Sequence, residues 1–277
     1  EVDGKIYARG ASDMKASVCA MVMGAYYFAM DTKRKFAGRV CVSCTVHEEC
    51  FEGISSRSVS ATIKPDFVIE GEATSSTVKI GQRGRAEVVV ETEGISCHSS
   101  NPEKGVNAVY SMMDVIHEIR KIVPSEHPIL GKGIFELTDI ISYPYPGASV
   151  VPSLCKATFD RRTLVGETEE IILAQIEDAI RRAQEKEPRI KAKCYVAIGK
   201  AKCWTGEVIE AKKFYPAWLV DKDSEEVKKA IEGLEKAGIE TKISHFSFCT
   251  NASHFCGEAG IPTIGYGPSL ESLAHVR

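Results

Sequence analysis

The chain has 277 residues, of which 44% are hydrophobic and 26% charged, and its formal net charge is -3 at pH 7. This composition is typical of a globular protein with one large or two ordinary domains, and the charge argues against a nucleic-acid-binding or anionic-membrane-binding surface. No apolar run approaches the roughly 20 residues that a membrane-spanning helix needs. Ten cysteines at irregular spacings indicate a reducing compartment rather than a disulfide scaffold, so a cytoplasmic location is expected.

The N-terminal part of the chain shows helical and strand patterns in alternation. The pattern predicts a short hairpin over residues 2–7, a helix over 13–30, a strand over 39–46, a helix over 53–63 and a strand over 66–70. Because the chain begins with Glu1 inside the predicted hairpin and stops just after His275, we expect it to be incomplete at both ends.

The middle of the chain has a pattern of its own. It predicts a strand over residues 86–92, a helix over 105–121, strands over 134–141 and 155–163, a helix over 168–185 and a strand over 190–198. This β-α-β-β-α-β order is that of a ferredoxin-like domain, in which one antiparallel sheet packs against two helices.

The C-terminal part returns to alternating helices and strands. It predicts a helix over residues 224–237, a strand over 239–243, a short helix over 252–259 and a strand over 263–266. Such alternation indicates a mixed, largely parallel sheet flanked by helices. The fold class expected is therefore α/β, with residues 1–83 and 195–277 forming one domain and residues 84–194 forming an inserted ferredoxin-like domain.

Acidic residues recur where predicted strands end. Glu48 and Glu49 follow one strand, Glu70 and Glu72 follow the next, and His275 comes after the last strand. Asp13 lies at a predicted helix start. Open α/β sheets bind ligands beyond the carboxyl ends of their strands, so these side chains are expected to converge. Clustered carboxylates repel one another and are costly to bury unpaired, which favours a pair of divalent metal ions among them.

The Glu48–Glu49 pair suggests a division of roles. One carboxylate binds metal while its neighbour moves a proton, and hydrolysis by a metal-activated water needs both. A solvated acidic loop is the alternative for a Glu–Glu pair taken alone. The combination with Asp13, Glu72 and His275 favours the metal-dependent hydrolase.

Four motifs carry a resemblance to a known family: R-G-x-x-D-M-K around Asp13, E-E at Glu48, G-E-x-T at Glu72, and G-P-S followed by A-H at His275. Together they resemble the dinuclear zinc exopeptidases that include aminoacylases, succinyl-diaminopimelate desuccinylases and glutamate carboxypeptidases. The resemblance implies that Asp13 bridges two zinc ions, or cobalt or manganese ions in their place. It also implies that Glu49 and His275 bind one metal, that Glu72 binds the other, and that Glu48 is the general acid/base.

The same resemblance assigns roles in the insert, which in this family is the lid or dimerisation domain, so a homodimer is expected. His98 resembles the family histidine that reaches a neighbouring subunit's site and stabilises the oxyanion. Asn107 and Arg162 match positions that contact the substrate, although strand alternation leaves Arg161 as the alternative to Arg162. The runs 81–85 and 96–100 are similar to a subgroup of selenium-metabolism-linked hydrolases.

The chain departs from the family pattern at three places, one of which is Ser149, where relatives commonly have Asn. The family's first metal histidine, in an H-x-D pair upstream of Gly10, has no counterpart because the chain starts too late to contain it. Residues 250–253 read T-N-A-S where relatives commonly have T-D-x-R.

The expected function is hydrolysis of an amide-type C–N bond in a small carboxylate-bearing peptide, N-acyl or N-carbamoyl compound. One alternative is a non-catalytic relative that binds a metal or ligand with the same fold. Another is an acidic cluster of purely structural role that binds no metal.

Overall fold

The computed structural model describes residues 1–275 and divides the chain into two compact units. Unit 1 comprises Glu1–Arg83 together with the chain from Ala217 onward, and unit 2 comprises Gly84–Pro216. The second unit thus ends later than the predicted boundary at residue 194. The residues that follow this position turn back and pair with the sheet of unit 2, as described below.

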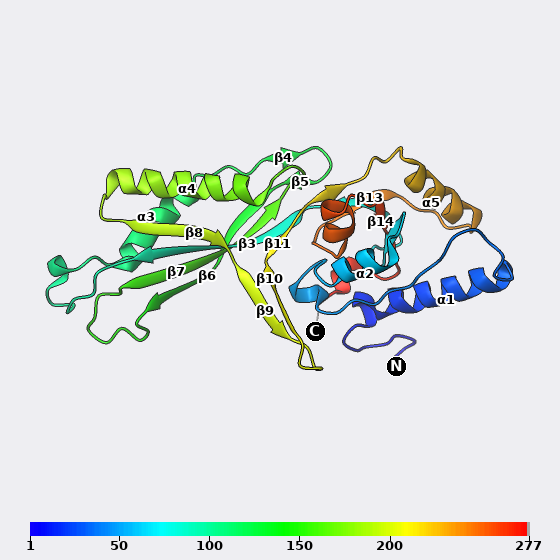
Figure 1. The fold of residues 1–277 in the computed structure, drawn as a ribbon, viewed down its shortest axis with the longest axis horizontal. Helices are drawn as coiled ribbons and strands as arrows, with labels where there is room; N and C mark the ends of the chain where they lie inside the picture. The colour runs from blue at the N-terminus through cyan, green and yellow to red at the C-terminus, as the bar shows by residue number, and fades with distance from the viewer. Residues whose placement is uncertain (276–277) are drawn as a thin grey trace. The chain divides into compact units, whose positions relative to one another are not determined.

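Unit 1 combines a small sheet with short helices (Figure 1). Its elements are η1 (Ala11–Lys15), α1 (Ala16–Asp31), η2 (Glu48–Cys50), α2 (Ser56–Ile63), β1 (Val68–Glu70), β2 (Val78–Gln82), β12 (Trp218–Leu219), α5 (Glu225–Lys236), β13 (Ile243–Phe246), η4 (Ser253–Glu258), β14 (Thr263–Gly265) and η5 (Glu271–Leu273).

The sheet of unit 1 is mixed, which confirms the predicted fold class. Its order is β1-β14-β2-β12, with β13 also pairing β2. The pairs β1–β14 and β2–β13 are parallel, whereas β14–β2 and β12–β2 are antiparallel. Val78 and Ile80 of β2 and Ile264 of β14 form the core of this unit with Val227 of α5.

The predicted strand over residues 39–46 is wrong for this structure, where the segment is irregular. Val40 and Val46 are more than half exposed, and no strand within residues 1–275 pairs with the segment. A strand needs a partner for its backbone N–H and C=O groups, so its apolar side chains alone do not form one.

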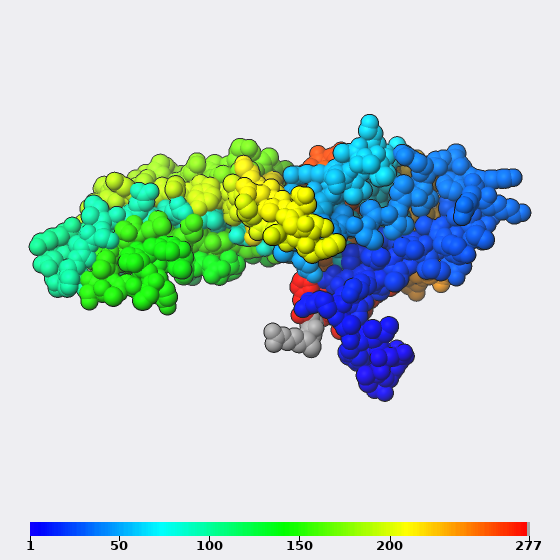
Figure 2. All heavy atoms as spheres, turned by 60° about the horizontal axis from the view of Figure 1, so that its bottom comes forward, coloured from blue at the N-terminus to red at the C-terminus, as the bar shows by residue number. Residues whose placement is uncertain are grey.

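The predicted hairpin over residues 2–7 is only a tight turn, closed by an isolated bridge between Val2 and Lys5. Figure 2 shows the first residues, in dark blue, standing out from the rest of unit 1. Among residues 1–275, no helix has the length and apolar character that crossing a bilayer requires.

Unit 2 contains the predicted β-α-β-β-α-β order with additional strands. Its elements are β3 (Gly84–Glu93), η3 (Pro102–Lys104), α3 (Ala108–Ile119), β4 (Glu126–His127), β5 (Gly131–Lys132), β6 (Ile134–Tyr143), β7 (Leu154–Thr163), α4 (Glu169–Lys186), β8 (Lys191–Val196), β9 (Ile198–Lys202), β10 (Val208–Lys212) and β11 (Phe214–Tyr215).

The ferredoxin-like arrangement of unit 2 is confirmed. The strands lie in the order β6-β7-β3-β8, every neighbouring pair is antiparallel, and α3 and α4 cover one face (Figure 1). Alternate residues of β7 point into the core beneath these helices. After β8 the chain forms the β9–β10 hairpin and returns as β11 to pair with β3, which extends the unit to Pro216.

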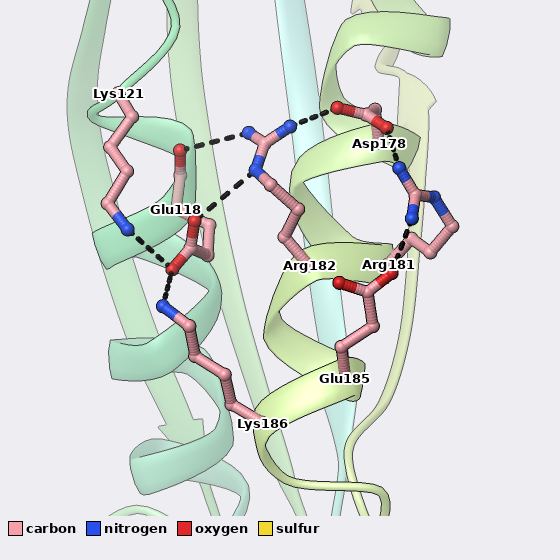
Figure 3. Close-up of polar contacts among 7 residues, drawn as sticks. All are labelled: Glu118, Lys121, Asp178, Arg181, Arg182, Glu185 and Lys186. Atoms are coloured by element: carbon pink, nitrogen blue, oxygen red, sulfur yellow. Dashed lines mark hydrogen bonds and ion pairs between the residues drawn. The ribbon is translucent and has the colours of Figure 1, made fainter.

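Glu118 joins the two helices of unit 2 (Figure 3). Its side chain, on α3, is only 2% exposed and accepts hydrogen bonds from Lys121 at 2.7 Å, Lys186 at 2.5 Å and Arg182 at 3.3 Å. Lys186 and Arg182 lie one turn apart on α4. The hydrogen bonds from Lys121 and Lys186 lower the pKa of Glu118 to about 2.

We predict that Glu118→Gln lowers the melting temperature at pH 7, because the three cations around this side chain lose their shared counter-charge. A carboxylate with a lowered pKa contributes stability above its ordinary pKa of 4.5, and this contribution is lost as the pH falls toward 2. The deficit of the variant should therefore shrink between pH 4.5 and pH 2 in thermal unfolding experiments.

Glu185→Gln is the matched control, because Glu185 lies on α4 and pairs with Arg181 at the surface. Glu185→Gln should leave the melting temperature nearly unchanged both at pH 7 and at low pH. A Glu118→Gln deficit that is absent at pH 7, or that does not change with pH, would contradict the assignment.

Candidate metal centre

Three side chains from distant parts of unit 1 meet at one point. Their possible ligand atoms, on Asp13, Glu49 and His275, lie within 4.8 Å of one another. His275 Nε2 lies 3.0 Å from Asp13 Oδ2 and 3.0 Å from Glu49 Oε2. Two carboxylates and an imidazole at this spacing form a donor set that suits zinc and similar divalent cations.

The backbone around Asp13 departs from helical geometry. Asp13 has φ -119° and ψ 100° within η1, and α1 begins only at Ala16. The side chain is therefore presented ahead of the helix rather than along its flank. Gly10, with φ 82°, precedes this turn, and Lys15 donates from Nζ to the carbonyl of Arg9. This local turn explains the spacing of the R-G-x-x-D-M-K motif.

Glu48 is partly buried among other acidic side chains. It opens η2, after His47 in the left-handed conformation. Loss of hydration, and then the negative charges of Glu52 and Glu70, raise the pKa of Glu48 to about 9. Glu49 and Asp13 act on it in the same direction. Glu48 and its neighbour Glu49 thus have different surroundings, since Glu49 is more than half exposed.

Glu70 ends β1 and Glu72 follows it, and both are buried, with exposures of 7% and 3% respectively. Burial, and then the charges of Glu48 and Glu70, raise the pKa of Glu72 well above its ordinary value. Burial raises the pKa of Glu70 to about 7, against an opposing hydrogen bond from Asn251.

The loop that carries Glu72 is held by the last loop of the chain. Thr74 Oγ1 donates to the carbonyl of Gly267 at 2.9 Å and accepts from its N–H at 3.0 Å. A side chain at position 267 would overlap the carbonyl oxygen of Glu72, so only glycine permits this approach. These contacts give the G-E-x-T and G-P motifs a common structural reason.

The acidic set as a whole fits divalent metal ions. Burial raises the pKa values of Glu48, Glu70 and Glu72, and neighbouring negative charges raise those of Glu48 and Glu72 further, so the carboxylates are costly to ionise together. A cation among them reverses this effect, because positive charge favours the ionised form. The structure thus groups the possible ligand atoms of Asp13, Glu49 and His275, whereas Glu72 is not part of this group. The charges of Asp13 and Glu49 nevertheless raise the pKa values of both Glu48 and Glu72.

His98 lies in an exposed loop of unit 2, where its backbone forms a bridge with Val150. Its Nδ1 accepts a hydrogen bond from the backbone N–H of Ser100 at 3.2 Å and lies 2.7 Å from Ser100 Oγ. An imidazole whose Nδ1 accepts carries its proton on Nε2 when neutral. His98 thus presents Nε2–H as a donor.

Asn107 and Arg162 occupy defined positions in unit 2. Asn107 is the N-cap of α3, and its Oδ1 accepts from the N–H of Val109 at 2.9 Å. Arg162 lies on the sheet face opposite the helices, and its Nε donates to Asp160 at 2.7 Å.

Arg161 points the other way, beneath the helices. It is 2% exposed, pairs with Glu167 at 2.7 Å and lies over the ring of Phe135. Of the two alternatives that the sequence left open, only Arg162 lies on the open face of the sheet.

The sequence analysis placed Glu70 among the acids at strand ends without a specific role, and it gave no role to Glu52 or Asn251, which the structure also brings to the acidic set. Glu52 and Glu70 raise the pKa of Glu48, and the side chain of Asn251 bonds Glu70. The run E-E-C-F-E over residues 48–52 was a signal for Glu52. Position 251 stood out in the sequence only as a departure from the family's T-D-x-R motif, and its contacts could not be predicted because they come from segments about 200 positions away.

Comparison with known proteins agrees with this architecture. Residues 80–188 match the family model of the peptidase dimerisation domain. The uncharacterized protein YgeY of Escherichia coli K12 is 31% identical over 280 residues, which covers 99% of this chain and 68% of YgeY. Succinyl-diaminopimelate desuccinylase 2 of Ruegeria sp. TM1040 is 30% identical over 174 residues, which covers 58% of this chain and 42% of the desuccinylase.

Among solved structures, aminopeptidase PepT from Bacillus cereus matches with a TM-score of 0.67 and 18% identity, over 91% of this chain and 61% of PepT. At this identity the likeness concerns the fold. The chain spans less than two thirds of the length of PepT and of the desuccinylase. The match to YgeY over more than two thirds of its length, together with the dimerisation domain and the desuccinylase relatives, shows that this chain belongs to the M20 family of peptidases and related amidohydrolases.

Proposed function

We propose that the protein hydrolyses an amide-type C–N bond in a small peptide, N-acyl or N-carbamoyl compound that carries a free carboxylate. The observation that carries this proposal is that Asp13, Glu49 and His275 lie together. The charges of Asp13 and Glu49 also act on the half-buried Glu48 and the buried Glu72. Membership of a family that contains peptidases and desuccinylases supports it.

The proposed metal ligands are Asp13, Glu49, Glu72 and His275, with Asp13 shared between two ions. The ions proposed are zinc, or cobalt or manganese in their place. When bound, they supply Lewis acidity toward the attacking water and the substrate carbonyl, and they offset the charge of the carboxylates. The family's first metal histidine, in its H-x-D motif, is not among the residues of this chain.

Glu48 is the proposed general acid/base. Glu48 is adjacent to the proposed metal ligand Glu49 but lies in a more enclosed position. Since Glu48 is not a proposed metal ligand, its carboxylate is free to take a proton from the attacking water and pass it to the leaving nitrogen. His98 is the proposed oxyanion donor through Nε2–H, since a donor aimed at developing negative charge favours the transition state.

Arg162 is the proposed partner of the substrate carboxylate. Asp160 accepts from Arg162 Nε at 2.7 Å and from Arg85 Nε at 3.0 Å, so this carboxylate orients two guanidinium groups on the open face of the sheet. A guanidinium group fixed in this way is suited to a paired interaction with a carboxylate. Asn107 is a second proposed substrate contact. Because its Oδ1 caps α3, its amide N–H groups are the relevant donors.

The first test replaces Glu48 by Gln in the full-length protein. We expect turnover of N-acyl amino acids, dipeptides and N-carbamoyl compounds to fall by about 10²–10⁴-fold, because proton transfer is lost. Zinc content, measured by elemental analysis, should stay at the wild-type level. The control is Glu240→Gln, an exposed residue of unit 1, which should retain full activity.

Turnover at the wild-type rate by the Glu48→Gln protein would show that the assignment of Glu48 is wrong. A wild-type protein that binds zinc but cleaves none of these compounds would favour the alternative, a non-catalytic metal-binding relative.

The second test concerns the metal. We expect the full-length protein to bind about two equivalents of zinc. For a single site, zinc at about 100 times its dissociation constant should raise the free energy of unfolding by about 2.7 kcal/mol. His275→Ala and Asp13→Asn should each reduce the bound zinc and this stabilisation. His117→Ala, on the exposed side of α3, should change neither. Zinc binding that is identical in all four proteins would refute the proposed ligand set.

We further propose that the protein is a homodimer formed through unit 2, which matches the dimerisation domain. Strand β6 is an edge of its sheet and has no neighbour on its outer side among residues 1–275. Ile140 on β6 and Tyr110 and Met113 on α3 are all at least half exposed. An unpaired edge beside exposed apolar side chains is suited to pairing with the same edge of a second copy.

The interface is tested by Ile140→Arg combined with Met113→Glu. We expect the wild-type protein to sediment as a dimer and the double variant as a monomer, because two charges are placed at the contact. Ile198→Arg, at an exposed site on the β9–β10 hairpin, is the control and should remain dimeric. A double variant that stays dimeric places the interface elsewhere.

A further inference from the structure

We propose that Asn251 is a positioning residue of the candidate metal centre, whose amide holds the turn bearing Glu48 and Glu49 against the strand end bearing Glu70 and Glu72. This inference rests on the proposed function, because it concerns the same site. Asn251 lies just before η4 and is 6% exposed.

The side-chain amide of Asn251 makes three contacts. Its Oδ1 accepts from the backbone N–H of Gly53 at 2.8 Å, and its Nδ2 donates to Thr45 Oγ1 at 3.0 Å. The amide also interacts with the carboxylate of Glu70, which opposes the rise in the pKa of that group. A primary amide offers one acceptor and two N–H donors, so each of its groups has a use here.

These contacts bracket the acidic turn. Thr45 precedes the Glu48–Glu49 pair by a few residues and Gly53 follows it, so one amide binds both ends of the turn. Its third contact, Glu70, ends β1 two residues before Glu72. The spacing between the two acid-bearing segments therefore depends on Asn251. A displacement of ligands by about 1 Å is enough to weaken a metal or catalytic site.

Gly53 gives an independent reason for a close fit. Its φ is +87°, and a Cβ at this position would lie 2.8 Å from His254 Cβ and 2.9 Å from the backbone N of His254. Only glycine allows the acidic turn to approach the 251–254 segment this closely. The turn is therefore packed against the backbone that carries Asn251, rather than linked to it by a single hydrogen bond.

The segment that carries Asn251 is itself anchored. His254 Nε2 lies 2.7 Å from Ser60 Oγ on α2, and His254 Nδ1 lies 2.7 Å from Glu258 Oε2. Glu258 also accepts from Arg57 of α2. The segment that carries Asn251 is thus fixed to α2, and a positioning residue requires such support.

An aspartate, which relatives commonly have at this position, would not reproduce the contacts that this asparagine makes. A carboxylate at position 251 would lack both N–H donors and would place another buried negative charge beside Glu70. Buried like charges without a counter-ion are costly, so the two acidic segments would separate. The neutral amide is the group of this size that satisfies a backbone N–H, a hydroxyl and a carboxylate together.

The experiment compares Asn251→Ala and Asn251→Asp with Thr250→Val in the full-length protein. Thr250 is the matched control, because it is the adjacent residue and fully buried, but its Oγ1 donates to Gln82 of β2 at 2.7 Å rather than to an acidic segment. Zinc affinity is measured by competition with a chromogenic chelator, and melting temperature and kcat are measured on the same samples.

We expect both Asn251 variants to bind zinc about 10–100-fold more weakly than wild type, as is usual when a group supporting metal ligands is lost. Their kcat should fall as well. Thr250→Val should lose melting temperature while retaining wild-type zinc affinity. Thr45→Val, which removes one of the three contacts, should give an intermediate affinity.

Asn251 variants that lose melting temperature but bind zinc as wild type does would overturn this inference and leave the proposed function intact. A wild-type protein that binds no zinc would overturn both. The two failures are therefore distinguishable in one series of titrations.

Discussion

The burial and crowding of carboxylates is the constraint on which the structure of unit 1 depends. Burial raises the pKa values of Glu48, Glu70 and Glu72, and the charges of Asp13 and Glu49 raise those of Glu48 and Glu72 further. No arrangement of neutral side chains removes this cost while all of these groups are ionised. Multivalent cations do, and the placement of His275 between two of the carboxylates supplies a nitrogen ligand of the kind that zinc prefers.

The neighbouring contacts explain how such a costly cluster is held in place. Thr74 and Gly267 join the loop after β1 to the last loop of the chain, and Asn251 joins the acidic turn to the end of β1. Each contact uses neutral polar groups or a glycine, so it adds no charge to the site. Neutral groups thus fix the positions of the acidic side chains, and the proposed metal ions offset their negative charge.

Sequence analysis predicted unit 2 well, because its signals are local. Alternation in β7 shows which of its positions face the core, and the capping residues Asn107 and Thr168 mark where α3 and α4 begin. The sequence analysis failed where the structure of a segment depends on which other segments pair with it. The valines near residue 42 form no strand because none pairs with them, and the buried β2 was missed because Lys79 and Gln82 break its apolar pattern. Motifs at strand ends likewise indicated the acids, whereas Asn251 acts only through contacts distant in sequence.

The central claim is that Asp13, Glu49, Glu72 and His275 share metal ions. X-ray diffraction from crystals of the zinc-loaded full-length protein, recorded on both sides of the zinc absorption edge, tests it most directly. The account predicts anomalous density between these four side chains, with Asp13 in contact with two peaks. Density at other residues, or none between these side chains in crystals whose zinc content is established, would contradict it.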